Sequence, residues 1–196
     1  MRFRIDWASS KLHAYEPTLE ELGTYAPALA AAWNDPHNAK LMGHGDVFDV
    51  DDVLAHAEAI RAEGGRAFLL FHDGQLAGDA DFRGVSKGSA EFAFMVASPS
   101  AQGKGLGTRF ALMLHRFAFT TLHLTHSYAS IDPINTASRR VFEKLGFAVD
   151  TGRAARAFAD EAGDVVMSID REAFDQLNAK TFADLSITSR EASLLR

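Results

Sequence analysis

The chain has 196 residues, of which 47% are hydrophobic and 23% charged, and its formal net charge is −6. This length and composition fit one globular domain with a full core, and the negative charge speaks against general nucleic-acid binding, which needs a basic face. The chain contains no cysteine, which excludes disulfides, thiolate metal sites and a cysteine nucleophile.

No stretch approaches the ~20 apolar residues of a membrane span, and no apolar signal-peptide core follows Met1. The eight histidines are scattered, and His123 and His126, the closest pair, have no further ligand at a suitable spacing. We therefore expect a cytoplasmic protein that binds no membrane, no nucleic acid and no metal ion.

Two helices are predicted in the first third of the chain. Thr18 and Glu21 form a capping box, and an apolar stripe with helical spacing runs from there to Trp33, where Asn-Asp-Pro stops it. Pro27 lies inside this stripe, so we expect a kink or two separate helices. A second helix is predicted over residues 53–60 and ends at a pair of glycines.

Antiparallel strands follow these helices. The apolar runs 67–71 and 76–83 flank an Asp73-Gly74 turn and predict a hairpin. A second turn at residues 86–88 leads to a strand over Glu91–Val96.

The second half of the chain alternates helices and strands. A long helix is predicted over residues 108–121, a strand over 125–131, a helix that begins at Asn135, and two strands near 154–158 and 165–169. Antiparallel strands followed by a β-α-β-α-β section predict a single α/β domain with a mixed sheet and helices on both faces.

The segment after Asn178 is polar and poor in apolar residues. We expect a loose helix or an arm there, so that residues 1–178 form the domain and 179–196 a C-terminal tail.

A glycine-rich loop lies between the strand Glu91–Val96 and the long helix, with the sequence Gln-Gly-Lys-Gly-Leu-Gly-Thr over residues 102–108. Strand, glycine loop and helix together point backbone N–H groups and the positive end of a helix dipole at a phosphate. The spacing fits neither the nucleotide-binding P-loop nor the G-x-G-x-x-G dinucleotide fingerprint. A phosphorylated small molecule of another kind is therefore predicted.

The pattern Gln-x-x-Gly-x-Gly in this loop resembles the pyrophosphate-binding loop of the GNAT superfamily of acetyl-CoA-dependent N-acetyltransferases. A second motif follows where that family has one: Asn135, Ser138 and Phe142 precede Lys-Leu-Gly-Phe at 144–147. The wording around Asn135 is most similar to the Rim-type branch, which acetylates ribosomal-protein N-termini and various small amines. The resemblance covers about residues 12–177 and implies a GNAT fold, with a mostly antiparallel sheet that contains one splayed parallel strand pair.

The resemblance implies acetyl-CoA as the co-substrate, lying between the two splayed strands. The main chain of 95–97 would pair with the pantetheine arm, and the amides of 103–108 would hold the pyrophosphate. Lys104 either adds positive charge there or is a solvated loop lysine, and Asn135 either contacts the co-substrate or only caps its helix. The implied cofactor-binding residues are Met95, Val96, Ala97, Gln102, Gly103, Lys104, Gly105, Leu106, Gly107, Thr108, Asn135, Ser138 and Phe142.

Phe142 departs from the family pattern. Many relatives carry a tyrosine at this position, where it can protonate the departing thiolate, and phenylalanine has no proton to give. Solvent or another side chain must then act as the acid, or the thiolate leaves unaided, which a thiol pKa of ~8.5 makes tolerable near neutral pH.

The general base is not evident from the sequence. Some relatives keep a catalytic glutamate where Glu91 stands, but if the preceding turn centres on Lys87, Arg83 lies opposite Glu91 and an ion pair explains both residues. Ser130 stands where other relatives have a glutamate.

Other carboxylates and a histidine share strand faces with these positions. His126, Tyr128 and Asp132 lie on one face by period-two alternation, and Asp79 and Asp81 share another face that could draw in a cationic amine. The candidate catalytic residues are Glu91, His126, Tyr128 and Asp132.

The cost of freeing the amine favours one class of acceptor. A lysine ammonium, with a pKa of ~10.4, needs ~4.6 kcal/mol to lose its proton at neutral pH, whereas an α-amino group needs only ~1.4 kcal/mol. Without an evident base, the sequence favours peptide N-termini or small amines of low pKa.

The resemblance thus predicts an N-acetyltransferase that moves acetyl from acetyl-CoA to a primary amine by direct attack in a ternary complex. Two alternatives stay open: a polyamine or drug acetyltransferase of the same fold, and a non-catalytic acyl-CoA-binding module. The sequence also leaves open a homodimer, the identity of the acceptor and the length of the acyl group.

Overall fold

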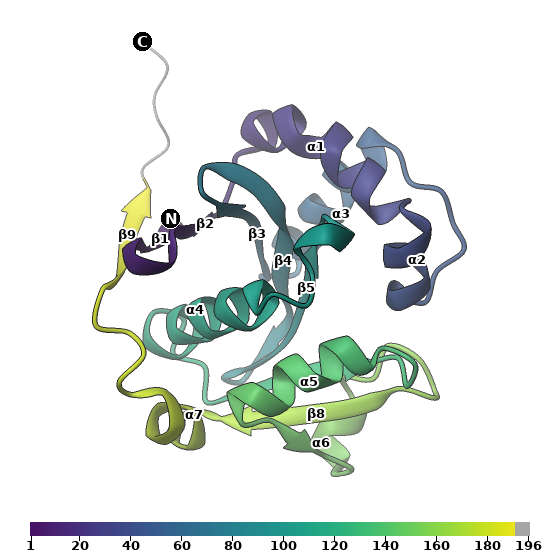
Figure 1. Cartoon of the computed structure of the whole chain (residues 1–196). Helices are drawn as coiled ribbons and strands as arrows, with labels where there is room; N and C mark the ends of the chain where they lie inside the picture. The colour runs from purple at the N-terminus through teal and green to yellow at the C-terminus, as the bar shows by residue number, and fades with distance from the viewer. Residues whose placement is uncertain (191–196) are drawn as a thin grey trace.

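A computed structural model describes residues 1–190, which form a nine-stranded sheet with helices on both faces (Figure 1). The order of the strands is β7-β8-β6-β5-β4-β3-β2-β1-β9. All neighbours are antiparallel except β5 and β6, which are parallel. The strands are β1 (Arg2–Trp7), β2 (Leu12–Tyr15), β3 (Arg66–His72), β4 (Gln75–Ser86), β5 (Ser89–Val96), β6 (His126–Ile131), β7 (Ala148–Val149), β8 (Val165–Asp170) and β9 (Leu185–Arg190).

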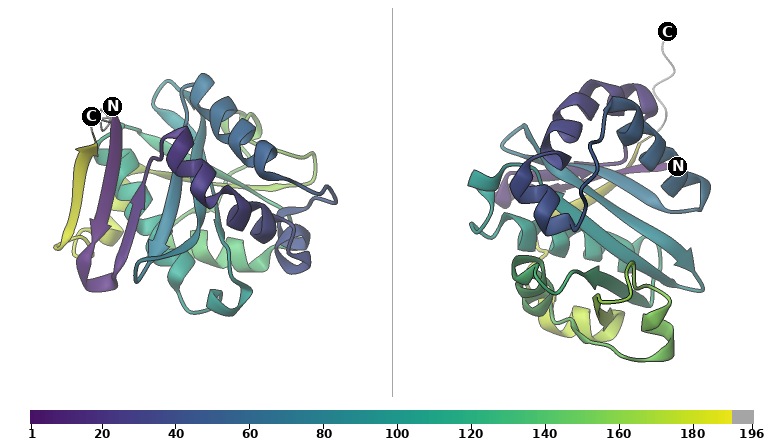
Figure 2. Two further views of the ribbon diagram at one scale, coloured as in Figure 1. Left: turned by 90° about the horizontal axis from the view of Figure 1, so that it is seen from above. Right: turned by 90° about the vertical axis from the view of Figure 1, so that its right-hand side faces the viewer.

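The helices form a layer on each side of this sheet (Figure 2). They are α1 (Leu19–Trp33), α2 (Pro36–Met42), α3 (Val50–Ala62), α4 (Leu106–Thr120), α5 (Thr136–Leu145), α6 (Arg153–Arg156) and α7 (Arg171–Asn178). Side chains of α1 and α3 pack on one face of the sheet, and those of α4 and α5 pack on the other. The mixed, mostly antiparallel sheet with helices on both faces is as the sequence predicted.

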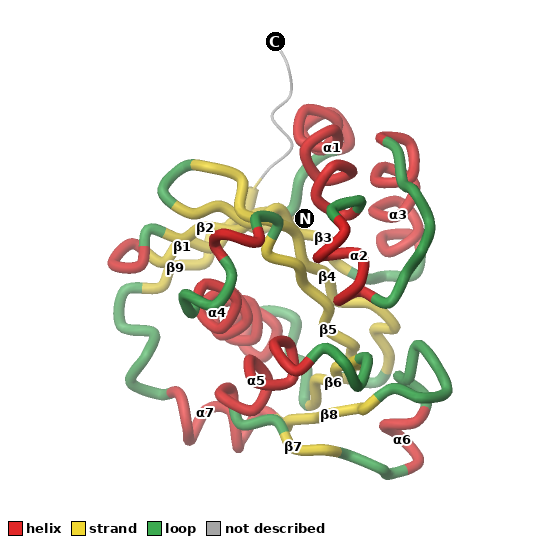
Figure 3. The backbone as a smooth tube through the Cα atoms, turned by 45° about the vertical axis from the view of Figure 1, so that its right-hand side comes forward, coloured by secondary structure: helices red, strands yellow, loops and turns green. Residues whose placement is uncertain are grey.

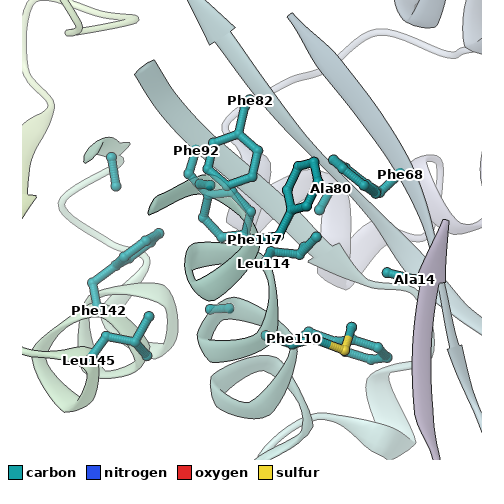
Figure 4. Close-up of a cluster of buried hydrophobic side chains, with 14 of the residues drawn as sticks. Ala14, Phe68, Ala80, Phe82, Phe92, Phe110, Leu114, Phe117, Phe142 and Leu145 are labelled. Carbon is teal, nitrogen blue, oxygen red and sulfur yellow. The ribbon is translucent and has the colours of Figure 1, made fainter. Parts of the chain in front are cut away.

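Helix α4 supplies the centre of the larger core. Its residues Phe110, Leu114 and Phe117 are fully buried and meet aromatic side chains of the sheet, among them Phe68 and Phe82 (Figure 4). The rings of Phe68 and Phe117 pack edge to face with centroids 5.4 Å apart, an arrangement that aromatic pairs prefer. Because α4 is anchored in this way, the glycine loop at its start is held in a fixed place.

The parallel pair β5–β6 separates soon after it begins. Only Ser89, Ala90 and Glu91 have register partners on β6, whereas β5 continues to Val96. Strand β6 remains paired with β8 over its whole length. A gap therefore opens between β5 and β6 toward their carboxyl ends, as the splayed pair of the sequence prediction requires.

Several local predictions are confirmed. Thr18 and Glu21 form the capping box of α1, residues 73–74 turn the β3–β4 hairpin, and Arg83 is the register partner of Glu91. Pro27, however, neither divides α1 nor ends it. It lies on the exposed side of the helix, where the carbonyl that loses its hydrogen bond can be hydrated, and the buried stripe on the other side holds the helix together.

The strand expected at residues 154–158 was wrong. Residues 153–156 form α6 instead, and the edge of β8 is paired with the short β7. The apolar residues of this segment serve a small cluster in which Ala155 is fully buried and the ring of Phe158 stacks on Tyr128, with centroids 4.3 Å apart. A run this short can satisfy either structure, and tertiary packing decides between them.

The expected arm or loose helix after Asn178 was also wrong for the part that the structure describes. Residues 185–190 form β9, which pairs with β1 along the edge of the sheet. Leu185 and Ile187 turn toward the core, and Asp184 accepts a hydrogen bond from the indole N–H of Trp7 at 2.9 Å. Two apolar residues among polar ones give too weak an alternation for a strand prediction, and β1 and β2 were missed as well. Residues 191–196 lie outside the described part of the chain.

Within residues 1–190, no helix combines the length and apolar character needed to cross a membrane. The same residues contain no group of three or more metal-ligating side chains that could hold a metal ion.

A buried histidine, His115, lies within the core of α4. Its Nδ1–H donates to the carbonyl oxygen of Ala111 at 2.7 Å, so Nε2 is the acceptor for the hydroxyl of Ser127 at 2.9 Å. Burial lowers the pKa of His115 to about 4, because the aromatic surroundings disfavour the imidazolium. The ring is therefore neutral in the folded protein at neutral pH.

This neutrality makes stability depend on pH. In the unfolded chain His115 binds a proton near pH 6.5, whereas in the folded chain it does so only near pH 4, so the unfolded state binds more protons within that window. We expect the free energy of unfolding to fall by about 2 kcal/mol between pH 7.5 and pH 5 on account of this group. Urea denaturation of the wild type and of His115→Gln measures the difference, and equal pH slopes in the two proteins would contradict it.

Candidate active site

Two cavities lie at the open end of the β5–β6 gap. The first, which we call the loop cavity, has a volume of about 290 Å³. Its walls come from the glycine loop, the end of β5, α2 and α5, and its lining residues include Gln102, Gly103, Gly105, Gly107, Thr108, Val96, Asn38, Arg140, Val141 and Lys144. No carboxylate lines it among the described residues, whereas Arg140 and Lys144 bring positive charge from α5.

The second, which we call the acidic cavity, has a volume of about 670 Å³. It lies between the α1–α3 side of the sheet, the end of β6 and the loop before β8. Its lining includes seven carboxylates, namely Asp52, Asp79, Asp81, Asp132, Asp160, Glu161 and Asp164. Arg83 is the permanently charged cation among the described residues that line it.

The two cavities meet. Phe94 and Met95 of β5, Leu41 and Met42 of α2, and Asn135 with Ser138 line both of them. Figure 3 shows α2 beside the ends of β4 and β5, across from α5. The loop cavity and the acidic cavity therefore form one cleft with differently charged halves, and groups bound in the two halves can meet at Phe94 and Asn135.

The N-terminus of α4 is prepared for an anion. Thr18, Asp35, Asp49, Asn135 and Asp170 cap their helices through side-chain hydrogen bonds. Within residues 1–190 no side chain caps α4, which begins at a glycine. Its first N–H groups have no partner in the helix, and a pyrophosphate can accept them. Together with the two cations on α5, this geometry fits the pyrophosphate of coenzyme A.

Glycine is required in this loop for two separate reasons. Gly103 and Gly105 have φ angles of +72° and +77°, a left-handed conformation that favours glycine. A Cβ on either would meet no atom within 4 Å, so the space beside both residues is empty. Gly107 is different, because a Cβ there would lie 2.9 Å from the ring of Phe94. Gly107 therefore lets α4 approach β5, while Gly103 and Gly105 leave room for a ligand.

The end of β5 presents main-chain groups to the gap. The N–H of Ala97 donates to Ala77 on the β4 side at 2.8 Å, so by alternation the N–H groups of Val96 and Phe94 face β6. The carbonyl of Val96 is already used by Gln102. Ala97 lines neither cavity, whereas Phe94 and Val96 line the loop cavity. The main-chain contact expected from 95–97 stays a prediction.

Three further predicted cofactor-binding residues differ in position, because Gln102 lines a cavity whereas Lys104 and Leu106 do not. Gln102 lines the loop cavity, but its side-chain amide is bonded to Asn38, Val96 and His37. Lys104 is exposed and Leu106 is buried, and neither lines a cavity.

Asn135 caps α5, as the sequence predicted. Its Oδ1 accepts the N–H of Ser138 at 2.9 Å, and its Nδ2 donates to the carbonyl of Leu41 at 2.8 Å. The side chain thereby ties α5 to α2 across the cleft. Phe142 is 2% exposed and packs edge to face against Phe94 with centroids 6.0 Å apart, so it contributes apolar wall and no proton.

Three of the four predicted catalytic residues line neither cavity. His126 and Tyr128 pair with the first residues of β5, and Val96 is seven residues beyond Ser89, or roughly 23 Å along the strand. Glu91 is bound to Arg83 at 2.8 Å, and burial raises the pKa of its carboxyl while Arg83 opposes this. Sequence alternation did not reveal these positions, because it gives the face of a strand and not the distance along it. Asp132 alone lines the acidic cavity.

Two carboxylates of β4 stand out on the inner wall of the acidic cavity. Oδ1 of Asp79 and of Asp81 is buried with no hydrogen-bond partner among the described residues, although Nε of Arg83 and Nε2 of His56 lie 3.8 and 3.7 Å from Asp81. Burial, reinforced by the carboxylate of Asp81, raises the pKa of Asp79 to about 7. Asp79 is therefore a candidate for a group that gains and loses a proton near neutral pH.

Sequence patterns did not point to α2, Phe94, Arg140 or Lys144, all of which line the cleft. A usable signal did exist for α2, because Asp35-Pro36 is an N-cap followed by proline at the first helical position. For Arg140 and Lys144 the spacing of four shows that they share a helix face, but not which face meets a cavity.

Comparison with known proteins identifies the family. A family model for the GNAT acetyltransferase domain matches residues 18–148. The spermidine N(1)-acetyltransferase of Escherichia coli is 34% identical over 134 residues, which is 67% of each chain. The chain belongs to the GNAT acetyltransferase family, and its co-substrate is acetyl-CoA.

Solved structures agree with this fold. Mycobacterium smegmatis RimJ in complex with CoA-disulfide superposes with a TM-score of 0.68 at 22% identity, over 91% of this chain and 92% of RimJ. The aminoglycoside acetyltransferase AAC(6')-Ib in complex with coenzyme A gives 0.69 at 21% identity, over 84% and 98% of the two chains. These structures confirm the GNAT fold expected from the sequence, and the family model and the spermidine acetyltransferase confirm the acetyltransferase class.

The position of Gly105 gives a direct test of the loop cavity. Gly105→Val places a side chain in the open space at the start of α4, and we expect coenzyme A to bind at least ten-fold more weakly by calorimetry. Gly74→Val is the matched control, because Gly74 has a φ of +76° and an equally open surrounding but lies in the β3–β4 turn. Both variants carry about 1–2 kcal/mol of backbone strain, so equal affinities for coenzyme A would contradict the placement.

Proposed function

We propose that the protein acetylates a primary amine of a small acceptor that carries two or more positive charges. The observation that carries this proposal is the division of the cleft into a half without carboxylates and a half with seven of them. The first half suits the anionic co-substrate, and the second suits a polycation. Opposite charges attract most strongly where water is partly excluded.

A peptide N-terminus is less well matched to this cavity. It brings one positive charge, whereas the acidic cavity offers carboxylates on four different segments: α3, β4, the end of β6 and the loop before β8. A flexible polyamine or an amino sugar can pair with several of them at once. The relatives support this choice, because one is named for spermidine and another for aminoglycosides.

The chain also offers a proton acceptor for such an amine. Carboxylates around an ammonium favour its charged form, so the proton must be taken before the nitrogen can attack. Asp79 is the best-matched acceptor, since its pKa of about 7 is close to a neutral working pH. Asp81 would keep the other charges of the acceptor bound.

The remaining roles follow from the end of β5. Acetyl-CoA supplies the acetyl group as a thioester. When the amine nitrogen bonds to the acyl carbon, the C–S bond breaks and coenzyme A leaves as a thiolate that carries the electron pair of that bond. By alternation the main-chain N–H groups of Phe94 and Val96 face the gap, and they would orient and polarise the acyl oxygen. The amine is held on the other side of this junction by the acidic cavity, so transfer takes place by direct attack in a ternary complex. Phe142 excludes water beside it.

A panel of acceptors tests the proposed substrate class. Thiol release from acetyl-CoA is measured with spermidine, kanamycin, a peptide with a free N-terminus and an N-blocked lysine peptide. We expect kcat/KM for one of the two polycations to exceed that for either peptide by at least ten-fold, and to fall as salt screens the cavity. A faster reaction with the free peptide N-terminus would overturn the proposal.

The role of Asp79 is tested through the pH profile. If Asp79 must be deprotonated to take the proton, activity should rise through pH 7 and level off above it. Asp79→Asn should remove this rise and lower kcat at least 100-fold. Asp81→Asn is the matched control on the same strand face. We expect a higher acceptor KM there, with the rise retained but shifted to lower pH, because the Asp81 carboxylate helps to raise the pKa of Asp79. An unchanged profile in Asp79→Asn would direct attention to Asp132.

A further inference from the structure

We propose that two asparagines, Asn34 and Asn38, are positioning residues that fix the two halves of the cleft separately. Asn38 holds the co-substrate wall, and Asn34 holds the acceptor wall. They are four residues apart, Asn34 at the end of α1 and Asn38 within α2. The part of the proposal that concerns Asn38 depends only on the co-substrate site. The part that concerns Asn34 rests on the proposed function, because it takes the acidic cavity as the acceptor site.

Asn38 joins three segments at the end of β5. It is 1% exposed. Its Nδ2 donates to the carbonyls of Ala32 and Ala97, both at 2.9 Å, and its Oδ1 accepts from Nε2 of Gln102 at 2.9 Å. The same Nε2 donates to the carbonyl of Val96 at 2.9 Å. Both N–H donors of Asn38 are thus used within the protein, and its Oδ1 already accepts one hydrogen bond there.

This network replaces what a neighbouring strand would provide. Beyond Glu91, β5 has no partner on β6, so on that side the carbonyl of Val96 is held by Gln102, and Gln102 by Asn38. Gln102 is also the first residue of the glycine loop. Asn38 therefore fixes, through one side chain, both the strand end that faces the acyl group and the loop that faces the pyrophosphate.

Asn34 makes a comparable clasp on the other half. Its Nδ2 donates to the carbonyl of Phe48 at 2.7 Å, and its Oδ1 accepts the N–H of Phe48 at 2.8 Å. The ring of Phe48 packs edge to face on Trp33 and on His44, with centroids 5.6 and 4.8 Å away. All three rings line the acidic cavity. The two hydrogen bonds thus place the connection between α2 and α3 as a wall of that cavity.

Replacing either asparagine by leucine keeps the number and branching of the side-chain heavy atoms and removes these bonds. We expect Asn38→Leu to weaken coenzyme A binding at least ten-fold and to change the acceptor KM less than two-fold. We expect Asn34→Leu to raise the acceptor KM at least five-fold and to leave coenzyme A binding within two-fold. Calorimetry with coenzyme A needs no acceptor, and the acceptor KM is measured with whichever amine of the panel reacts fastest. Failure of the acceptor class and failure of this proposal are then distinct results.

Asn178→Leu is the matched control for lost stability. Asn178 is 8% exposed and donates to the carbonyls of Phe174 and Leu145, but it lies on α7 and lines neither cavity. Its loss should lower the melting temperature without changing either binding parameter. If Asn38→Leu fails to fold, Gln102→Leu breaks the same link from the other side and should give the same loss of coenzyme A affinity.

The proposal is supported if Asn38→Leu weakens only coenzyme A binding and Asn34→Leu raises only the acceptor KM. With both folded, Asn38→Leu and Gln102→Leu combined should cost less than the sum of the two single effects, because they break one network. The proposal is overturned if Asn34→Leu and Asn38→Leu change both parameters alike, or if neither differs from Asn178→Leu.

Discussion

The hydrogen bonds that β5 and β6 do not make are the constraint from which the rest of the structure follows. After Glu91 the two strands separate, and main-chain groups that a continuous sheet would have paired are turned toward a gap. A buried main-chain group without a partner costs about 1–3 kcal/mol. The chain satisfies the carbonyl of Val96 with Gln102, and it leaves N–H groups of β5 for a ligand. The site is thus a sheet left open at one place, and we propose that a bound molecule fills that place.

The rest of the sheet can tolerate this gap because each strand at the gap is held from its other side. Strand β6 is paired with β8 over six residues, and β5 with β4 almost along its whole length. Helices α4 and α5 pack beneath the opening and bury Phe142 and Leu145. Charge is then divided between the two sides of the junction, with Arg140 and Lys144 on one side and the carboxylates of β4 on the other. The backbone determines where the co-substrate and the acceptor meet. The side chains determine whether each half of the cleft favours a negatively or a positively charged molecule.

The parts of this site that could be predicted from the sequence are those governed by local rules. The glycine loop is one, since positive φ angles and an uncapped helix start leave a readable pattern; the cap at Asn135 and the Arg83–Glu91 pair are others. The rest depends on tertiary register. Alternation placed His126, Tyr128 and Asp132 on one face, but the point at which β6 leaves β5 decides that only Asp132 reaches the cleft. Strand β9 carries too few apolar residues to be recognised before β1 is known to lie beside it.

The pairing of β1 with β9 also has a consequence for the order in which the protein can be completed during synthesis. Arg2 and Arg190 are register partners, so one edge of the sheet joins the earliest and the latest parts of the described chain. While the ribosome is still adding residues, β1 can pair with β2 but has an open edge, and the indole of Trp7 lacks Asp184. An open strand edge is a site for association with other chains. The cleft, built from residues 33–164, can assemble before that edge is closed, and the final strand protects a fold whose functional part is already in place.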